Sequence, residues 1–265
     1  MCRLLGVVSD RPVTVADAVG EVVLKDFVAL TKIHGDGWGV ARVEAAGGSP
    51  AVVVSAGSAL DDPEFIAAAA EVSAPASIVH LRWATAGLAV RLENSHPFVA
   101  DGLAMAHNGS IRPVEPLEAM LTPEVAAKLR GTTDSERYFA LIRQHRRTAA
   151  NLREAVRDAV SELRAVYPEA SLNALVLGEG QLVAVHAHAR TTLPDDDIEQ
   201  LSAVDLPAEH VEDYFALRLA RPDDHTVVIG STGFGDLPWQ PLPPESVTAV
   251  ALSDLSVTSV PLVAD

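Results

Sequence analysis

Met1-Cys2-Arg3-Leu4-Leu5-Gly6 opens the chain and places its only cysteine at the second position. Removal of the initiator Met1 would leave Cys2 N-terminal, so that one residue would carry both a thiol and a free α-amine. An α-amino group titrates near pH ~8 and a free thiol near ~8.5, so the amine can accept the thiol proton close to neutrality. This stretch therefore predicts an N-terminal cysteine nucleophile.

The same residue also has a purely structural interpretation. Buried cysteine usually acts as a small hydrophobic residue, and its position alone does not separate that role from catalysis. The apolar run 4–8 ends at Ser9-Asp10-Arg11-Pro12, which predicts a buried strand followed by a turn. In either interpretation Cys2 enters at the beginning of a strand.

Composition narrows the class of protein. At 265 residues with 48% hydrophobic content, we expect one domain spanning 1–265 with a substantial core. The net charge of −16 argues against nucleic acid and anionic membrane surfaces as partners. A single cysteine excludes internal disulfides and multi-cysteine zinc sites. The run 4–8 is shorter than a secretory apolar region of ~7–15 residues. We therefore expect a cytoplasmic protein without metal or cofactor.

Hydrophobic patterning predicts strands interleaved with helices. Strands are expected over 4–8, 40–43, 51–54, 77–81, 103–106, 173–177, 182–186, 226–229 and 247–252. Helices are expected over 14–33, 61–72, from Thr133 onward and over 149–166, with an irregular acidic excursion over 191–224 that holds one short helix. Hairpins rather than strict βαβ alternation favour an α+β fold with antiparallel sheets. Two sheets face to face between helical layers suit the length, although composition does not select this over a plainer α+β fold.

Several short motifs lie where predicted strands end or helices begin. They are His34-Gly35-Asp36-Gly37-Trp38-Gly39, His80-Leu81-Arg82-Trp83-Ala84-Thr85, Asn94-Ser95-His96-Pro97-Phe98, His107-Asn108-Gly109 and Thr133-Asp134-Ser135-Glu136. Together with Cys2, and in this order, they resemble the class II glutamine amidotransferases, which are N-terminal-nucleophile hydrolases. The stand-alone bacterial members, related to γ-glutamyl hydrolases of the ergothioneine pathway, are the most similar. The resemblance implies a four-layer αββα sandwich and cleavage of a γ-glutamyl amide.

The resemblance also implies roles for individual residues. Cys2 matches the nucleophile, and Asn108 with Gly109 matches the oxyanion hole. Arg82 matches the anchor for the substrate α-carboxylate, and Asp134 the acceptor for its α-ammonium. Two further residues match the pocket lining, namely Trp83 and Thr85.

Each of these residues has a structural alternative. Asn108-Gly109 is a common hairpin turn, and Asp134 could simply belong to a helix cap. Arg82 could be a surface charge on an edge strand. Trp83 could be a core residue, and Thr85 an ordinary strand residue.

One motif departs from the family pattern. Relatives fused to synthase domains carry an Arg-Gly pair where this chain has His34-Gly35-Asp36. We therefore do not assign the role of that arginine to this stretch. Instead, we expect Asp36 and Trp38 to brace the loop beside Cys2.

Three other motifs are discounted. His186 and His188 alternate along a strand as some metal ligands do, but they have no cysteine partner and no nearby acidic triad. Asp195-Asp196-Asp197 could coordinate a hard cation, although such runs are usually solvated loops. The glycine-rich stretch 230–235 lacks the lysine and the spacing of a P-loop.

Two functional outcomes stay open from the sequence. One is hydrolysis of glutamine or a γ-glutamyl metabolite through a thioester. The other is a glutaminase subunit that delivers ammonia to a separate synthase. A different class of function is a non-catalytic regulatory protein that binds glutamine or a γ-glutamyl compound.

Overall fold

The computed structural model describes residues 2–45, 47–84 and 90–262 of the chain. In these residues the strands form two antiparallel sheets, one of seven strands and one of six. In order, the larger sheet contains β11 (Gln240–Pro241), β9 (Leu217–Asp223), β10 (Thr226–Ser231), β1 (Cys2–Val13), β4 (Ala74–Arg82), β2 (Trp38–Val43) and β3 (Ala51–Ser55). The smaller contains β13 (Val257–Pro261), β12 (Ser246–Ala251), β8 (Gln181–His186), β7 (Asn173–Gly178), β6 (Leu103–Asn108) and β5 (Phe98–Ala100).

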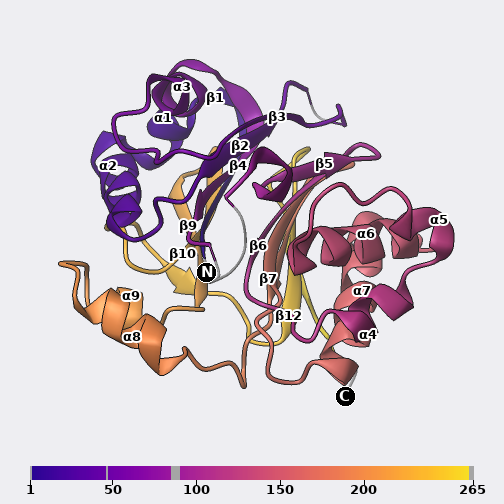
Figure 1. Cartoon of the computed structure of the whole chain (residues 1–265). Coiled ribbons are helices and arrows are strands. Elements are labelled where there is room, and N and C mark those ends of the chain that lie inside the picture. The colour runs from indigo at the N-terminus through magenta and orange to yellow at the C-terminus, as the bar shows by residue number, and fades with distance from the viewer. Residues whose placement is uncertain (1, 46, 85–89, 263–265) are drawn as a thin grey trace.

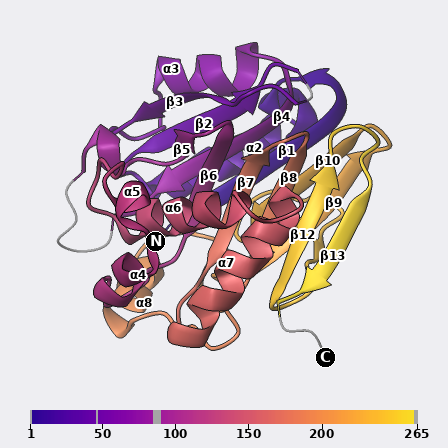
Figure 2. The same ribbon diagram turned by 90° about the vertical axis from the view of Figure 1, so that its right-hand side faces the viewer.

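Helices cover the outer face of each sheet, so the expected four-layer αββα sandwich is confirmed (Figures 1 and 2). The larger sheet is covered by α1 (Val15–Val19), α2 (Glu21–Ala29), the short η1 (Leu30–Lys32), α3 (Pro63–Ile66) and the π-helical η2 (Ala67–Glu71). The smaller sheet is covered by α4 (Glu115–Met120), α5 (Pro123–Ala126), α6 (Asp134–Arg146) and α7 (Leu152–Val166). Three short helices lie in loops: η3 (Leu92–Asn94), α8 (Asp195–Ser202) and α9 (Glu209–Glu212).

Alanine and branched apolar side chains fill the space between the two sheets. Leu4 and Val8 of β1 join the cluster between the sheets, whereas Leu5 and Val7 pack under the outer helices. A side chain at Gly6 would have its Cβ 2.7 Å from the Cδ2 of Leu182 in the opposite sheet. Glycine at this position therefore allows β1 to lie against β8, which fixes the strand that carries Cys2.

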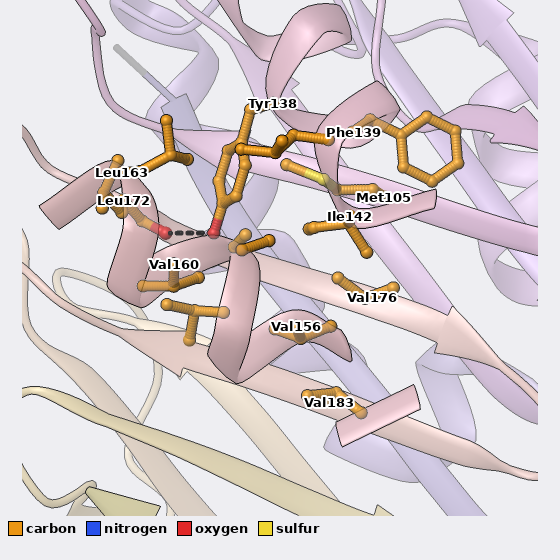
Figure 3. Packing of buried hydrophobic residues seen from close by; sticks show 14 of the residues in the cluster. Met105, Tyr138, Phe139, Ile142, Val156, Val160, Leu163, Leu172, Val176 and Val183 are labelled. Carbon is orange, nitrogen blue, oxygen red and sulfur yellow. Dashed lines mark hydrogen bonds between the residues drawn. The ribbon is translucent and has the colours of Figure 1, made fainter. Parts of the chain in front are cut away.

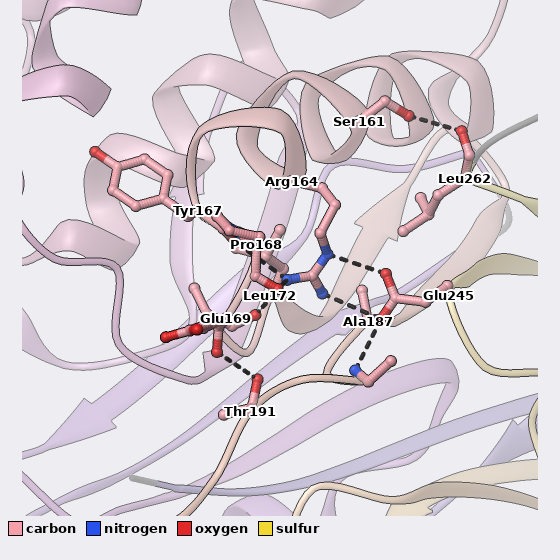
Figure 4. A network of polar contacts seen from close by, with 12 residues as sticks. Ser161, Arg164, Tyr167, Pro168, Glu169, Leu172, Ala187, Thr191, Glu245 and Leu262 are labelled. Atoms are coloured by element: carbon pink, nitrogen blue, oxygen red, sulfur yellow. Dashed lines mark hydrogen bonds and ion pairs between the residues drawn. The ribbon is translucent and has the colours of Figure 1, made fainter.

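The second helical layer packs on the smaller sheet through a continuous apolar cluster (Figure 3). Tyr138 of α6 is fully buried there, and its hydroxyl donates to the carbonyl of Leu172 at 3.2 Å. The end of α7 is fastened by Arg164, whose Nε lies 3.0 Å from Glu245 Oε2 (Figure 4). The guanidinium also donates to three carbonyls, those of Tyr167, Pro168 and Ala170. These contacts hold α6 and α7 rigidly over the strand that ends at Asn108.

Several boundaries differ from the sequence expectation. The helix expected over 14–33 is broken at Gly20, whose φ of 86° ends α1 and precedes α2. The prediction for 191–224, an irregular excursion with one short helix, is wrong in two respects. The segment holds two helices, and the strand β9 begins at Leu217. The expected helix over 61–72 is α only as far as Ile66 and then continues as η2.

Two broader expectations concern membrane-spanning helices and the number of domains. None of the helices in the described ranges is long and apolar enough to cross a membrane. That residues 1–265 form a single domain stays a prediction.

Candidate active site

Cys2 is held between the two sheets. It begins β1, where it pairs in register with Arg82 of β4, and its side chain is 7% exposed. Its backbone nitrogen donates to the Oδ1 of Asn108 in the other sheet at 2.8 Å, and its Sγ lies 4.0 Å from the carbonyl oxygen of Trp83. The predicted nucleophile is therefore fixed in position and partly shielded from solvent.

Asn108 ends β6, and its two amide atoms have different surroundings. Oδ1 accepts from Cys2, whereas Nδ2 is buried and has no hydrogen-bond partner in the described part of the chain. An amide N–H that is buried beside a nucleophile is suited to stabilise a developing oxyanion. The alternative of a hairpin turn is wrong, because β6 pairs with β7, which begins only at Asn173.

Position 109 requires a glycine, because neighbouring atoms leave no room for a side chain there. A Cβ at this position would collide with the carbonyl oxygen of Ser171 and would lie 2.7 Å from the Nε2 of His107. No residue with a side chain fits there without moving β6 away from the chain at Ser171. The backbone of the predicted oxyanion hole is thus fixed by close packing.

Arg82 is held by the glycine-rich loop that precedes β2. The backbones of Arg82 and Asp36 are joined at 2.9 Å, and Arg82 Nη1 donates to the Asp36 carbonyl at 3.5 Å. The Asp36 carboxylate accepts from Ala84 N at 2.8 Å. Asp36 therefore braces the end of β4, as expected. Trp38 is a core residue, since its indole donates to Asp62 and packs on Phe65.

Asp134 is the first residue of α6, and its carboxylate faces the same space. Its Oδ2 accepts from Ile111 N at 2.5 Å and its Oδ1 from Ser135 N at 2.9 Å. The cap itself is Thr133, whose Oγ1 accepts from Glu136 N. Asp134 is thus oriented by two backbone groups, which leave its remaining lone pairs available to an ammonium group.

A small cavity joins most of the predicted site residues. Its walls are Cys2, Arg82, Trp83, Ala84, Asn94, His96, His107, Gly109, Thr133, Asp134 and Ser135. Its volume is about 20 Å³, which is room for about one water molecule, so a glutamyl substrate requires its walls to move. Asp134 also lines a wider neighbouring cavity of about 620 Å³, formed with residues 111–115 and Thr132. Thr85 lies outside the described residues.

Three buried histidines lie at this cavity: His96 and His107 line it, and the ring centre of His80 lies 4.4 Å from that of His96. Burial is the main cause that lowers the pKa of His80 to about 3, and the charge of Arg82 adds to it. The pKa of His96 is also lowered by burial, with the charge on His80 contributing next. For His107, burial lowers the pKa while the charge of Asp134 opposes it. All three are therefore neutral near pH 7.

His107 connects the predicted oxyanion residues, Asn108 and Gly109, to α6. Its Nε2 donates to the Ser171 carbonyl at 3.0 Å, so its Nδ1 is free to accept from Ser135 Oγ at 2.9 Å. Sequence reasoning gave no role to His107, Asn94, His96 or Ser135. Their positions could have suggested a role, because all four stand within the motifs that carry the family resemblance.

The discounted motifs lie apart from this cavity. His186 Nε2 lies 2.9 Å from His188 Nε2, and the pKa of His188 is lowered to about 4, chiefly by burial. Asp195, Asp196 and Asp197 form the first turn of α8. Within the described ranges, no cluster of three or more His, Cys, Asp or Glu side chains could hold a metal ion.

Comparison with known proteins agrees with this geometry. The model of the family described as "Glutamine amidotransferases class-II" matches residues 1–258. Glutamine–fructose-6-phosphate aminotransferase (isomerizing) of Escherichia coli K12 is 31% identical over 175 residues, which are 63% of this chain and 26% of that protein. The corresponding enzyme of Vibrio vulnificus is 30% identical over 172 residues, with the same coverage. The chain thus spans about a quarter of the length of these curated relatives.

Solved structures show the same fold. A glutamine aminotransferase class-II domain protein from Silicibacter pomeroyi has a TM-score of 0.66 and 17% identity, over 99% of this chain and 100% of its own. Glutamine phosphoribosylpyrophosphate amidotransferase from B. subtilis has a TM-score of 0.62 and 14% identity, over 100% of this chain and 50% of its own. These neighbours confirm the N-terminal-nucleophile type of sandwich.

Proposed function

Because the chain belongs to the class II glutamine amidotransferase family, we propose that it hydrolyses a γ-glutamyl amide through a thioester on Cys2. The observation that carries this proposal is the contact between Cys2 N and Asn108 Oδ1 at 2.8 Å, which joins Asn108 to the residue that bears the sulfur, while the Asn108 amide nitrogen is buried and unpaired in the described structure. Arg82 and Asp134 line the same cavity with opposite charges. The arrangement suits a substrate that carries an α-carboxylate, an α-ammonium and a reactive amide.

In the proposed mechanism, removal of Met1 frees the α-amine of Cys2. This amine accepts the thiol proton, and the thiolate attacks the γ-carbonyl carbon. Asn108 Nδ2 and the Gly109 N–H stabilise the resulting oxyanion. The ammonium of Cys2 then protonates the departing nitrogen, the thioester forms, and water releases glutamate.

Substrate orientation follows from the two charged residues. A guanidinium can grip both oxygens of the α-carboxylate, which suits Arg82. Asp134 receives the α-ammonium, and Trp83 lines the glutamyl pocket. Asp134 also lines the wider neighbouring cavity, which we propose as the route of substrate entry.

Glutamate release by wild type and Cys2→Ala tests the proposal. Glutamine and a panel of γ-glutamyl amides are the substrates, and mass spectrometry of the intact protein records whether Met1 has been removed. We expect the variant to lose essentially all release while its fold, judged by circular dichroism, is unchanged. Equal nonzero rates for the two proteins would remove Cys2 from the mechanism, and no release by either protein would favour a non-catalytic binding protein.

A second candidate is a glutaminase subunit that supplies ammonia to a separate synthase. The observation that favours it is the similarity to glutamine–fructose-6-phosphate aminotransferase, whose name pairs glutamine with a second substrate. This candidate predicts a low glutaminase rate for the isolated protein that rises when a partner is added. The hydrolase candidate predicts full turnover alone, with a γ-glutamyl metabolite preferred over glutamine.

A further inference from the structure

Arg3 directly follows the nucleophile but faces away from it. Because side chains alternate along a strand, Cys2 points between the sheets and Arg3 points to the outer face of β1. Arg3 is fully buried there. Its guanidinium carbon lies 3.7 Å from the centre of the Tyr214 ring, and its Nη1 donates to the Thr232 carbonyl at 3.4 Å.

The other edge of this guanidinium makes no hydrogen bond. Nε and Nη2 of Arg3 are buried and have no hydrogen-bond partner among the residues that the structure describes. These two nitrogens form the edge that can donate to two acceptor atoms, or to one anion, at once. The Tyr214 hydroxyl and His210 Nδ1 also lack a described partner, and their rings lie 5.6 Å apart.

The neighbouring groups do not neutralise the charge on Arg3. Burial raises the pKa of Tyr214 and lowers that of His210 to about 3, so both are uncharged near neutrality. Cys2 and Asp197 act electrostatically on Tyr214, but the described contacts include no ion pair of either residue with Arg3. A cation–π contact recovers only part of the hydration that a buried guanidinium loses. A water molecule would satisfy the N–H groups but would leave the charge uncompensated.

We propose that the Nε–Nη2 edge of Arg3 binds a small inorganic anion, for which chloride is the probe, with the Tyr214 hydroxyl as an additional donor. The anion would connect the first residues of β1 to the segment after α9, on the opposite face of the strand from Cys2. This site is separate from the glutamyl site and does not depend on the proposed hydrolysis.

Halide replacement tests the proposal on the wild-type protein. Crystals grown in sodium bromide should show an anomalous peak beside Nε and Nη2 of Arg3. In solution, replacing gluconate by chloride at constant ionic strength should raise Tm by about 3 °C, the shift expected for a site that is nearly saturated. Bromide found only at surface positions, or equal Tm values in the two salts, would overturn it.

Arg218 supplies a matched control. Its Nε and Nη2 likewise have no hydrogen-bond partner in the described structure. Its guanidinium carbon lies 5.1 Å from the centre of the Trp239 ring. However, its Nη1 lies 3.0 Å from a carboxylate oxygen of Glu209, which neutralises its charge. Arg3→Met should abolish the chloride response and Arg218→Met should retain it. A response that survives in Arg3→Met would contradict the assignment, and the wild-type halide experiments decide the question if that variant does not fold.

Discussion

The two ends of the Asn108 side-chain amide have different surroundings. The oxygen accepts from Cys2 N at 2.8 Å, while the buried nitrogen makes no hydrogen bond to the described residues. Sequence could suggest this residue through the His-Asn-Gly motif, but it could not show which atom faces Cys2. That choice depends on the packing of two sheets, because the residues are 106 positions apart.

Asn108→Asp separates the roles proposed for these two atoms. The aspartate keeps an oxygen for Cys2 N but replaces the N–H donor with a negatively charged oxygen. We expect kcat to fall by at least ~10²–10³, since that is the typical loss when one oxyanion donor is removed. Steady-state glutamate release measures this. Asn151→Asp is the control, because either side chain can cap α7. An unchanged kcat in Asn108→Asp would exclude Asn108 from the oxyanion hole.

Helices and strands are predicted correctly from sequence where interactions between neighbouring residues determine them. Thr133 was expected to begin a helix, and it caps α6 with its side chain. The acidic segment 191–224 gave no comparable signal. Its strand β9 exists because it pairs with β10 on one side and β11 on the other. Such long-range pairing has no local pattern to reveal it.

The capping bond of α6 gives a prediction about stability. Thr133→Ala removes the acceptor of Glu136 N, which lies at 3.2 Å, and should cost about 1 kcal/mol of unfolding free energy. Thr122→Ala is the control, because Thr122 precedes α5 without a side-chain capping bond and should change stability little. Urea unfolding measures both variants. Equal losses would show that the Thr133 hydroxyl does not contribute as a cap.

At the scale of the whole molecule, the site exists only when both sheets are assembled. The larger sheet supplies Cys2 and Arg82, and the smaller sheet supplies Asn108, while Asp134 comes from the helix layer above it. The sequence suggested the layers through its alternation of strands and helices. It did not show that His80 and His96 are buried against each other, with ring centres 4.4 Å apart beside the cavity.

These buried histidines predict how stability depends on pH. The pKa of His80 is lowered from 6.5 to about 3, so the unfolded chain binds a proton that the folded chain refuses over that interval. The contribution of His80 to the free energy of unfolding is therefore complete above pH 6.5. It is lost as pH falls toward about 3, by up to ~1.4 kcal/mol per pH unit. Urea unfolding at pH 7, 6 and 5 measures the slope.

Two variants assign this slope to His80. His80→Asn should reduce the slope by the contribution of one group, since His96, His107, His188 and His210 also have lowered pKa values. His225→Asn should change it much less, because His225 is exposed and its ion pair with Asp10 is screened by solvent. Identical slopes in wild type and His80→Asn would show that His80 is not the group that titrates.

The central claim is that the sulfur of Cys2 attacks a γ-glutamyl carbonyl. Its most direct test is intact-mass and peptide mass spectrometry of the protein after incubation with a glutamine analogue that carries a chloromethyl ketone in place of its amide. We expect one covalent adduct per chain, on Cys2 of a chain that lacks Met1, and protection from labelling by excess glutamate. Absence of an adduct on Cys2, or labelling that glutamate does not slow, would contradict it.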